Sequence, residues 1–195
     1  HVLFRRQRQM CIRDSNNHGQ NNLDGTQKDC TTVDQVRNRL SLIDQEVNGK
    51  KIMVYNLCAH KIKGDMGKAW WISKKPYVGK SKLDRRVEQN LDLVEKLVSL
   101  GIPRKQVFVT GHSCGGLTTL MFFARHPEKA GGGIAYAPAC FDKLSKKYKV
   151  KKKGLDEALA RFKKKKPAQF DLRAKYNDEI LNQVKTPLLV FTHPK

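Results

Sequence analysis

The sequence predicts an α/β fold: a mostly parallel sheet with flanking helices, incomplete at both ends. Short apolar runs typical of buried strands alternate with segments whose apolar residues recur every three or four positions. The chain has 195 residues, of which 39% are hydrophobic, enough for one domain with a sizeable core. Alternating strands and helices indicate parallel strands joined by crossovers, so a functional site is expected at the carboxyl ends of the strands.

The first fifteen residues are expected to lie outside this fold. Residues 1–15 show no clear period and look like translated sequencing-adapter read-through, so we interpret them as an artefactual, unstructured leader. Residues 16–195 are then one partial domain. It opens with a polar, glycine-punctuated loop over residues 16–25.

Spacing and turn residues place the elements that follow. A helical period runs from the cap at Thr31-Thr32 to Val47 and stops at Asn48-Gly49, and a second one ends before Gly101 and Pro103. Continuous apolar runs mark the strands between them. In chain order we predict a helix over 33–47, a strand over 51–57, a loop over 59–80, a helix over 83–98, strands over 107–110 and 133–137 with a helix over 117–124 between them, a basic insertion over 142–182, and a strand over 186–192.

A Gly-x-Ser-x-Gly sequence lies between the strand over 107–110 and the helix after it. A serine on such a tight strand-to-helix turn has a strained backbone, and its hydroxyl projects above the sheet, so Ser113 is a candidate nucleophile. Gly111 and Gly115 remove side chains that would collide where strand and helix cross. The amide of Cys114 begins the helix and faces the place where an oxyanion would form.

At these residues the chain resembles the α/β-hydrolase superfamily, in particular its dienelactone-hydrolase-like and esterase-like branch, over about residues 16 to 195. The resemblance implies a serine hydrolase that acts on a carboxylic ester, lactone or related acyl bond of a small molecule, without metal or organic cofactor. It also implies a second oxyanion amide after an early His-Gly pair, here Gln20 after His18-Gly19. A plain surface turn is the alternative for that segment.

The resemblance implies the order nucleophile, acid and histidine, but the expected acid loop begins at His193, after which only Pro194 and Lys195 are given. We therefore expect the acid and the histidine to lie beyond Lys195, and the fragment itself to be inactive. His126 ends the helix and is expected to meet its dipole, while His112 projects to the other side of the turn. His60 and Trp70-Trp71 either line the pocket or are ordinary loop residues.

Charge suggests a second, different function. The chain carries 39 Lys and Arg against 18 Asp and Glu, a net charge of +21, with much of the excess in the Lys-rich insertion over 142–182, interpreted as a cap or lid. That insertion is either a solvated cap or a surface for an anionic partner. In the second case the chain would be a non-catalytic binding domain with a hydrolase fold. Only Tyr148 and Phe162 occur among the basic residues from Lys143 to Lys166, so no specific nucleic-acid binding is predicted.

Two further expectations concern the compartment and the cysteines. No apolar run is long enough for a membrane span, and the compartment is left open. No cysteine pair has metal-ligand spacing, and a disulfide framework is not expected. The cysteines stand at positions 11, 30, 58, 114 and 140.

Overall fold

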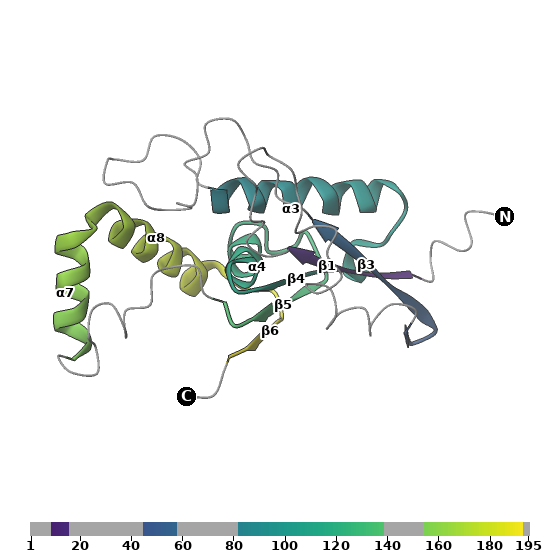
Figure 1. Cartoon of the computed structure of the whole chain (residues 1–195). Helices are drawn as coiled ribbons and strands as arrows, with labels where there is room; N and C mark the ends of the chain where they lie inside the picture. Colours follow the sequence, from purple (N-terminus) through teal and green to yellow (C-terminus); the bar gives the residue numbers. More distant parts are fainter. Residues whose placement is uncertain (1–8, 16–44, 58–81, 139–153, 193–195) are drawn as a thin grey trace, which may run out of the picture.

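The computed structural model describes residues 9–15, 45–57, 82–138 and 154–192. Within them lies one sheet of six strands in the order β2-β3-β1-β4-β5-β6 (Figure 1). Only β2 is antiparallel to its neighbour, so the predicted mostly parallel sheet is confirmed. The elements are β1 Gln9–Ser15, β2 Glu46–Val47, β3 Lys50–Leu57, α3 Lys82–Ser99, η3 Arg104–Gln106, β4 Val107–His112, α4 Cys114–Arg125, β5 Gly132–Tyr136, α7 Leu155–Lys165, α8 Pro167–Gln183 and β6 Leu188–Phe191.

The segment that we expected to be an unstructured leader supplies an inner strand. β1 pairs in parallel with β3 on one side and with β4 on the other. The prediction for residues 1–15 is therefore wrong for Gln9–Ser15. An inner parallel strand is typically a short continuous apolar run, here Met10-Cys11-Ile12, so the missing alternation was no evidence against a strand.

The predicted helix over 33–47 also needs a correction at its end. Glu46–Val47 form β2, which pairs with β3 through a two-residue turn. Asn48 and Gly49 have φ angles of 52° and 71°, the left-handed pair that a type I′ hairpin turn requires. Val47 fits the helical period, but Asn-Gly favours the hairpin. Residues 33–44 lie outside the described part of the chain.

The main core lies between the sheet and three helices on one of its faces. α4 is the central helix: it contacts β4, β5, α3 and α8, and nearly every one of its side chains is buried. None of the described helices is both long and apolar enough to cross a membrane. The core includes Leu83, Val87, Val94 and Leu97 of α3, Val107 and Val109 of β4, and Leu117, Met121, Phe122 and Phe123 of α4.

α8 belongs to this core rather than to a separate lid. Tyr176 is buried in the main cluster, and Arg125 at the end of α4 donates to Glu179 of α8 at 2.8 Å and to Asp84 of α3 at 2.6 Å. The Tyr176 hydroxyl donates to the same Asp84 carboxylate at 3.1 Å. Most of α8 is therefore not part of the expected cap over 142–182. This helix belongs instead to the crossover connection between β5 and β6.

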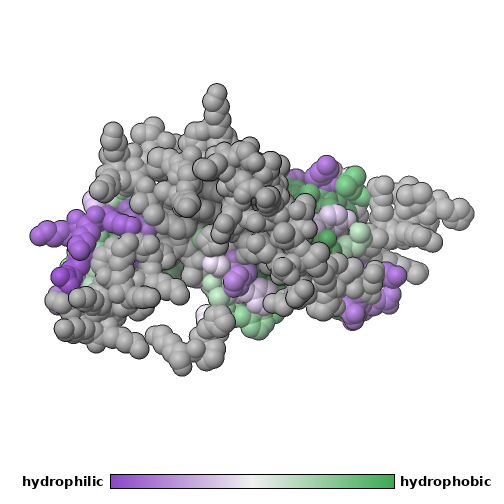
Figure 2. Space-filling model, in the orientation of Figure 1, coloured by the Kyte–Doolittle hydropathy of each residue, from purple (hydrophilic) through white to green (hydrophobic). Residues whose placement is uncertain are grey.

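α7 packs on α8 through a small apolar cluster of its own. Ala158 and Phe162 are buried there, and the Phe162 ring meets the Phe170 ring edge to face at 5.8 Å. The rest of α7 is exposed and basic; it forms the hydrophilic region at the left of Figure 2. A cap, if one exists, is thus limited to α7 and residues 142–153, and the latter lie outside the described residues.

The end of α3 is fixed by hydrogen bonds that the sequence signals. Gly101 has a φ of 91°, and its amide bonds the Val98 carbonyl at 2.9 Å while the amide of Ile102 bonds the Leu97 carbonyl at 3.2 Å. This pair of bonds is a Schellman motif, in which glycine supplies the left-handed residue. Leu97 and Ile102 are both buried, so the motif also returns the chain to the core.

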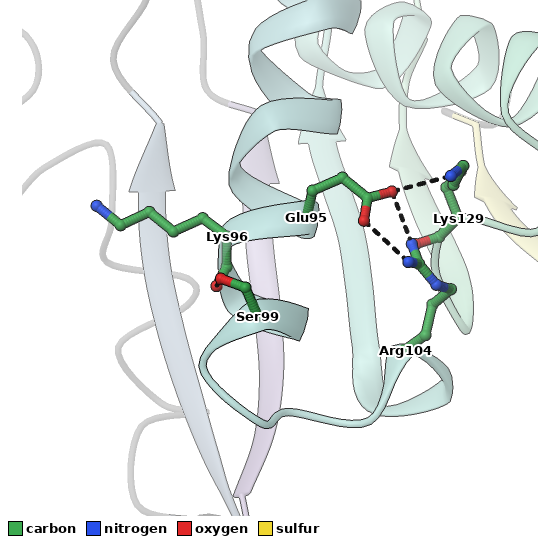
Figure 3. Close-up of polar contacts among 5 residues, drawn as sticks. All are labelled: Glu95, Lys96, Ser99, Arg104 and Lys129. Atoms are coloured by element: carbon green, nitrogen blue, oxygen red, sulfur yellow. Dashed lines mark hydrogen bonds and ion pairs between the residues drawn. The ribbon is translucent and has the colours of Figure 1, made fainter.

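An ion cluster holds the amino ends of β4 and β5 to α3. Glu95 of α3 accepts two hydrogen bonds from the Arg104 guanidinium, at 3.0 and 2.9 Å, and forms an ion pair with Lys129 at 3.1 Å (Figure 3). Arg104 also donates to the Lys129 carbonyl at 3.0 Å. The bonds from Arg104 and Lys129 lower the pKa of Glu95 to about 2. Figure 3 also shows the Ser99 hydroxyl, which donates to the Lys96 carbonyl at 2.8 Å.

Neutralising Glu95 should reduce stability in a pH-dependent way. Because folding lowers this pKa, the ionised carboxylate stabilises the fold above pH 4.5, and that contribution disappears as pH falls toward about 2. We expect Glu95→Gln to lower the thermal midpoint at pH 7 and to match the unsubstituted chain near pH 2. Asp92→Asn, which removes an exposed carboxylate from the same helix, is the control. A Glu95→Gln deficit that is unchanged at pH 2 would contradict this role.

Candidate active site

Ser113 lies on the turn between β4 and α4, the strand-turn-helix context that the sequence predicts. Its backbone angles are φ 54° and ψ −118°, a strained conformation that a non-glycine residue adopts only when its surroundings impose it. Its hydroxyl does not cap α4, although Ser113 occupies the N-cap position. The geometry presents the side chain at the carboxyl end of the sheet, where its chemical role stays a prediction.

The strain at Ser113 is held by backbone contacts on both sides. Its amide donates to the Tyr136 carbonyl of β5 at 2.9 Å, and its carbonyl accepts from the Leu117 amide of α4 at 3.1 Å. The turn is thus bonded to the neighbouring strand and to its own helix. The amide of Cys114 stands at the positive end of the α4 dipole, as the predicted oxyanion donor requires.

Gly116 allows α4 to approach the sheet this closely. A Cβ atom at this position would lie 3.0 Å from the Tyr136 carbonyl oxygen, 3.1 Å from the Pro138 Cα and 3.2 Å from the Gly111 carbonyl oxygen. All three neighbours are backbone atoms, which cannot rotate away as a side chain would. The predicted elbow glycines, Gly111 and Gly115, are both buried in the same crossing.

Cys114 corrects the expectation about disulfides. Its side chain is fully buried and disulfide-bonded, so it is no thiol nucleophile. Cys11 pairs with Val107 at the opposite end of β4, about 20 Å along the strand from Cys114, too far for a disulfide. The cysteines at 30, 58 and 140 lie outside the described residues. Cysteine spacing gave no sign of this bond.

The position of β1 bears on the predicted second oxyanion donor. Asp14 is in register with Thr110, so β1 ends beside the end of β4, the strand that leads into the Ser113 turn. The early strand that should precede His18-Gly19 is therefore present, where the sequence analysis took it for a leader. Gln20 itself lies outside the described residues, and its role stays a prediction.

The described histidines do not reach Ser113 as a base. His126 is the C-cap of α4, at the far end of a helix of 12 residues, about 18 Å away. Burial, and then the charges of Arg125 and Lys129, lower its pKa, and the expected interaction with the helix dipole stays a prediction. His112 is exposed on β4. Outside the described residues lie His60, His193 and the pair Trp70-Trp71.

Two residues that sequence reasoning missed lie at this end of the sheet. Tyr136 ends β5 and Phe191 ends β6, and their rings stack with centroids 5.1 Å apart and planes 10° from parallel. Each is the next-to-last residue of a predicted strand, so the signal was its place in the sheet rather than a motif. Strand register, which needs the structure, brings the two rings together.

The similarity of this chain to solved structures is weak. No curated protein matches this sequence. A phospholipase/carboxylesterase from Dyadobacter fermentans is similar in structure, with a TM-score of 0.49 and 13% identity, over 98% of this chain and 84% of that chain. A monoacylglycerol lipase from Paleococcus ferrophilus has a TM-score of 0.45 and 18% identity, over 92% of this chain and 71% of that chain.

The family comparison covers more than half of the sequence. The sequence model of the family described as serine aminopeptidase, S33, matches residues 79–193, a span that contains the Ser113 turn and the strands on either side of it. The sheet order and the strand-turn-helix geometry described above are those expected of an α/β-hydrolase. The chain therefore belongs to the serine aminopeptidase S33 family of α/β-hydrolases.

Proposed function

We propose that Ser113 is the nucleophile of a serine hydrolase that acts on a carboxylic ester, lactone or related acyl bond of a small molecule. The observation that carries this proposal is the strained backbone of Ser113 at the strand-helix turn, with φ 54° and ψ −118°. A strained residue supported by bonds to two elements is typical of a functional position. Family membership supports a hydrolase but leaves the nucleophile and the substrate to be tested.

In the proposed mechanism the Ser113 Oγ attacks the substrate carbonyl carbon while its proton passes to a histidine. The carbonyl oxygen becomes an oxyanion, which accepts hydrogen bonds from the amides of Cys114 and Gln20. Collapse of this intermediate expels the leaving group, protonated by the histidine, and leaves an acyl-serine. Water, deprotonated by the same histidine, then releases the carboxylic acid. One oxyanion donor contributes about 10²–10³-fold in kcat.

The catalytic acid and histidine are proposed to follow Lys195, as the order of the resembling family implies. β6 ends at Phe191 beside β5, so the chain after it leaves the sheet at the same edge as Ser113. That position suits an acid loop. On this proposal residues 1–195 alone are inactive, and the longer protein hydrolyses acyl bonds.

The proposal does not specify whether the leaving group of the substrate is an alcohol or an amine. The family description names an aminopeptidase, so the related acyl bond includes an amide as well as an ester or lactone. The chemistry at Ser113 is the same for each, because attack, oxyanion and acyl-enzyme are shared. Parallel assays with a 4-nitrophenyl ester and an aminoacyl 4-nitroanilide separate the two classes.

A second candidate is a binding role through the basic surface of α7. Arg161, Lys163, Lys164 and Lys165 are exposed on this helix, and only Asp156 and Glu157 oppose them there. Such a surface attracts an anionic partner through long-range electrostatics. This function needs neither Ser113 nor an oxyanion hole, and it is independent of the first.

Replacing the nucleophile should abolish acyl transfer without unfolding the protein. We expect Ser113→Ala, in the reading frame extended past Lys195, to lose all labelling by a fluorophosphonate probe and at least about 10³-fold in kcat/KM. Ser99→Ala, which removes an exposed hydroxyl bonded to the Lys96 carbonyl, is the matched control. A Ser113→Ala protein that keeps most activity would exclude Ser113 as the nucleophile.

Adding a methyl group at Gly116 should disturb the elbow more than the fold. Gly116→Ala forces α4 away from Tyr136 and Gly111, and we expect slower fluorophosphonate labelling of the extended protein, with about 1–3 kcal/mol lost in stability. Gly133→Ala is the control: its Cβ would overlap Phe123 at 2.5 Å, in the middle of β5. Its folded fraction should label at the normal rate. Equal slowing in both variants would contradict a specific role for Gly116.

The binding candidate predicts a steep dependence on salt. If the α7 lysines hold an anionic partner, retention of the chain on heparin should fall sharply as the salt concentration rises. A variant with Lys163, Lys164 and Lys165 changed to Gln should elute at clearly lower salt. Lys96→Gln, Lys105→Gln and Lys185→Gln combined remove the same charge elsewhere, at exposed residues, and are the control. Equal shifts of the elution salt in both triple variants would mean that retention depends on net charge alone, which would contradict a specific role for α7.

A further inference from the structure

We propose that Ala137 is a positioning residue for Ser113. The peptide group made by the carbonyl of Tyr136 and the amide of Ala137 lies beside the Ser113 turn, and we call it the bridging peptide. The left-handed backbone of Ala137 fixes the orientation of the bridging peptide, which in turn holds the Ser113 turn to the sheet. This inference rests on the proposed function, because it concerns how the nucleophile is oriented.

The bridging peptide makes one hydrogen bond on each side. Its carbonyl accepts from the Ser113 amide at 2.9 Å, and its amide donates to the Phe191 carbonyl at 2.6 Å. No cis peptide bond occurs among the described residues, so this carbonyl and this amide point in opposite directions. One rigid plane at the end of β5 therefore connects the turn after β4 with the end of β6.

The orientation of this plane depends on an unusual φ angle. Ala137 has a φ of 41°, and among the described residues only two other non-glycine residues, Asn48 and Ser113, have a positive φ. Rotation about the N–Cα bond of Ala137 turns the bridging peptide relative to the chain that follows it. A return to the ordinary negative range of φ needs a rotation of about 100° or more. Such a rotation cannot leave the bridging peptide and residue 138 both in place.

Both sides of Ala137 are packed against the first turn of α4. A Cβ at Gly116 would lie 3.0 Å from the carbonyl oxygen of Tyr136 and 3.1 Å from the Cα of Pro138. A change of φ at Ala137 must therefore move either the bridging peptide or Pro138 relative to the elbow. In the first case the bond from the Ser113 amide is lost, and in the second the packing at Gly116 is lost.

The two strained residues at this end of the sheet are linked directly. The amide of Ser113 bonds the peptide group that Ala137 orients, and strained non-glycine residues persist where their surroundings impose them and cluster at functional sites. The alternative is that Ala137 only ends β5. That alternative predicts that a substitution at residue 137 destabilises the whole fold, whereas a positioning role predicts a local effect at Ser113.

The first test measures amide hydrogen exchange in the 195-residue chain. Ala137→Val places a β-branched residue at a positive φ, so we expect the Ser113 amide to exchange at least about fivefold faster relative to the Val94 amide inside α3. Ala137→Gly adopts this φ without steric cost and should keep the protection. Asn48→Val introduces the same side chain at a φ of 52° in the exposed β2–β3 turn and is the matched control.

The second test measures labelling of the extended protein by the fluorophosphonate probe. We expect Ala137→Val to lower the limiting rate constant of labelling at least about fivefold, with the half-saturating probe concentration unchanged, because only the orientation of Ser113 changes. Ala137→Gly should restore the rate constant, and Asn48→Val should leave it unchanged. A purely structural defect would reduce the labelled fraction but not the rate constant of the folded molecules.

Four results would overturn the positioning role of Ala137. They are unchanged exchange of the Ser113 amide in Ala137→Val, equal acceleration at Ser113 and Val94, the same effect at Ser113 in Asn48→Val, and an unchanged limiting rate constant in Ala137→Val. Failure of the proposed function gives a different result. Faster exchange at Ser113 in Ala137→Val, in a protein whose extended form is never labelled at Ser113, would retain the bridging peptide and reject only the nucleophile.

A further measurement applies if Ala137→Val does not fold. The NMR coupling across the hydrogen bond between the Ser113 nitrogen and the Tyr136 carbonyl carbon is then measured in the unsubstituted chain and in Ala137→Gly. Coupling in both proteins supports the bridging peptide, because both adopt the positive φ that it requires. Its absence from the unsubstituted chain overturns the proposal.

Discussion

The contact of one helix backbone with the ends of two strands constrains the rest of this molecule. At Gly116, α4 lies so close to the ends of β4 and β5 that a single Cβ would touch backbone atoms of Gly111, Tyr136 and Pro138. This approach sets where the Ser113 turn stands above the sheet and brings its amide to the Tyr136 carbonyl. Since backbone cannot yield as side chains do, the elbow is positioned by the fold itself rather than by a network of polar side chains.

The far end of α4 is fixed by charge instead. Arg125 bridges Asp84 of α3 and Glu179 of α8, and its guanidinium lies 5.6 Å from the centre of the Tyr176 ring. Both acids are partly buried, where ion pairs are screened less than at the surface. α4 is thus held by glycine packing at its start and by ion pairs at its end, and the two neighbouring helices cannot shift without breaking one of these contacts.

The sequence predicted what depends on local signals and missed what depends on pairing. The elbow, the long helix ended by Gly101 and the strands over β3 to β6 follow from residues close together in the chain. β1 was missed because a short inner strand has no alternation, and β2 because Val47 fits a helical period equally well. For the same reason the site was only half predictable. A local sequence motif identifies Ser113. The stacking of Tyr136 on Phe191 instead depends on the register between β5 and β6.

The strain at Ser113 has a consequence for how the elbow is stabilised. A non-glycine residue at φ 54° costs about 1–3 kcal/mol, and burial of an aromatic side chain such as Phe122 or Phe123 offsets a cost of that size. The disulfide at Cys114 adds a covalent restraint to the same turn. The ion pairs of Glu95 and Arg125 lie away from the elbow. Packing, backbone bonds and a cross-link thus hold the turn, and the amides at the start of α4 contribute a positive field above Ser113. In the proposed mechanism, fixed amides would stabilise a developing oxyanion without responding to pH, so the titration of activity would come from the base alone.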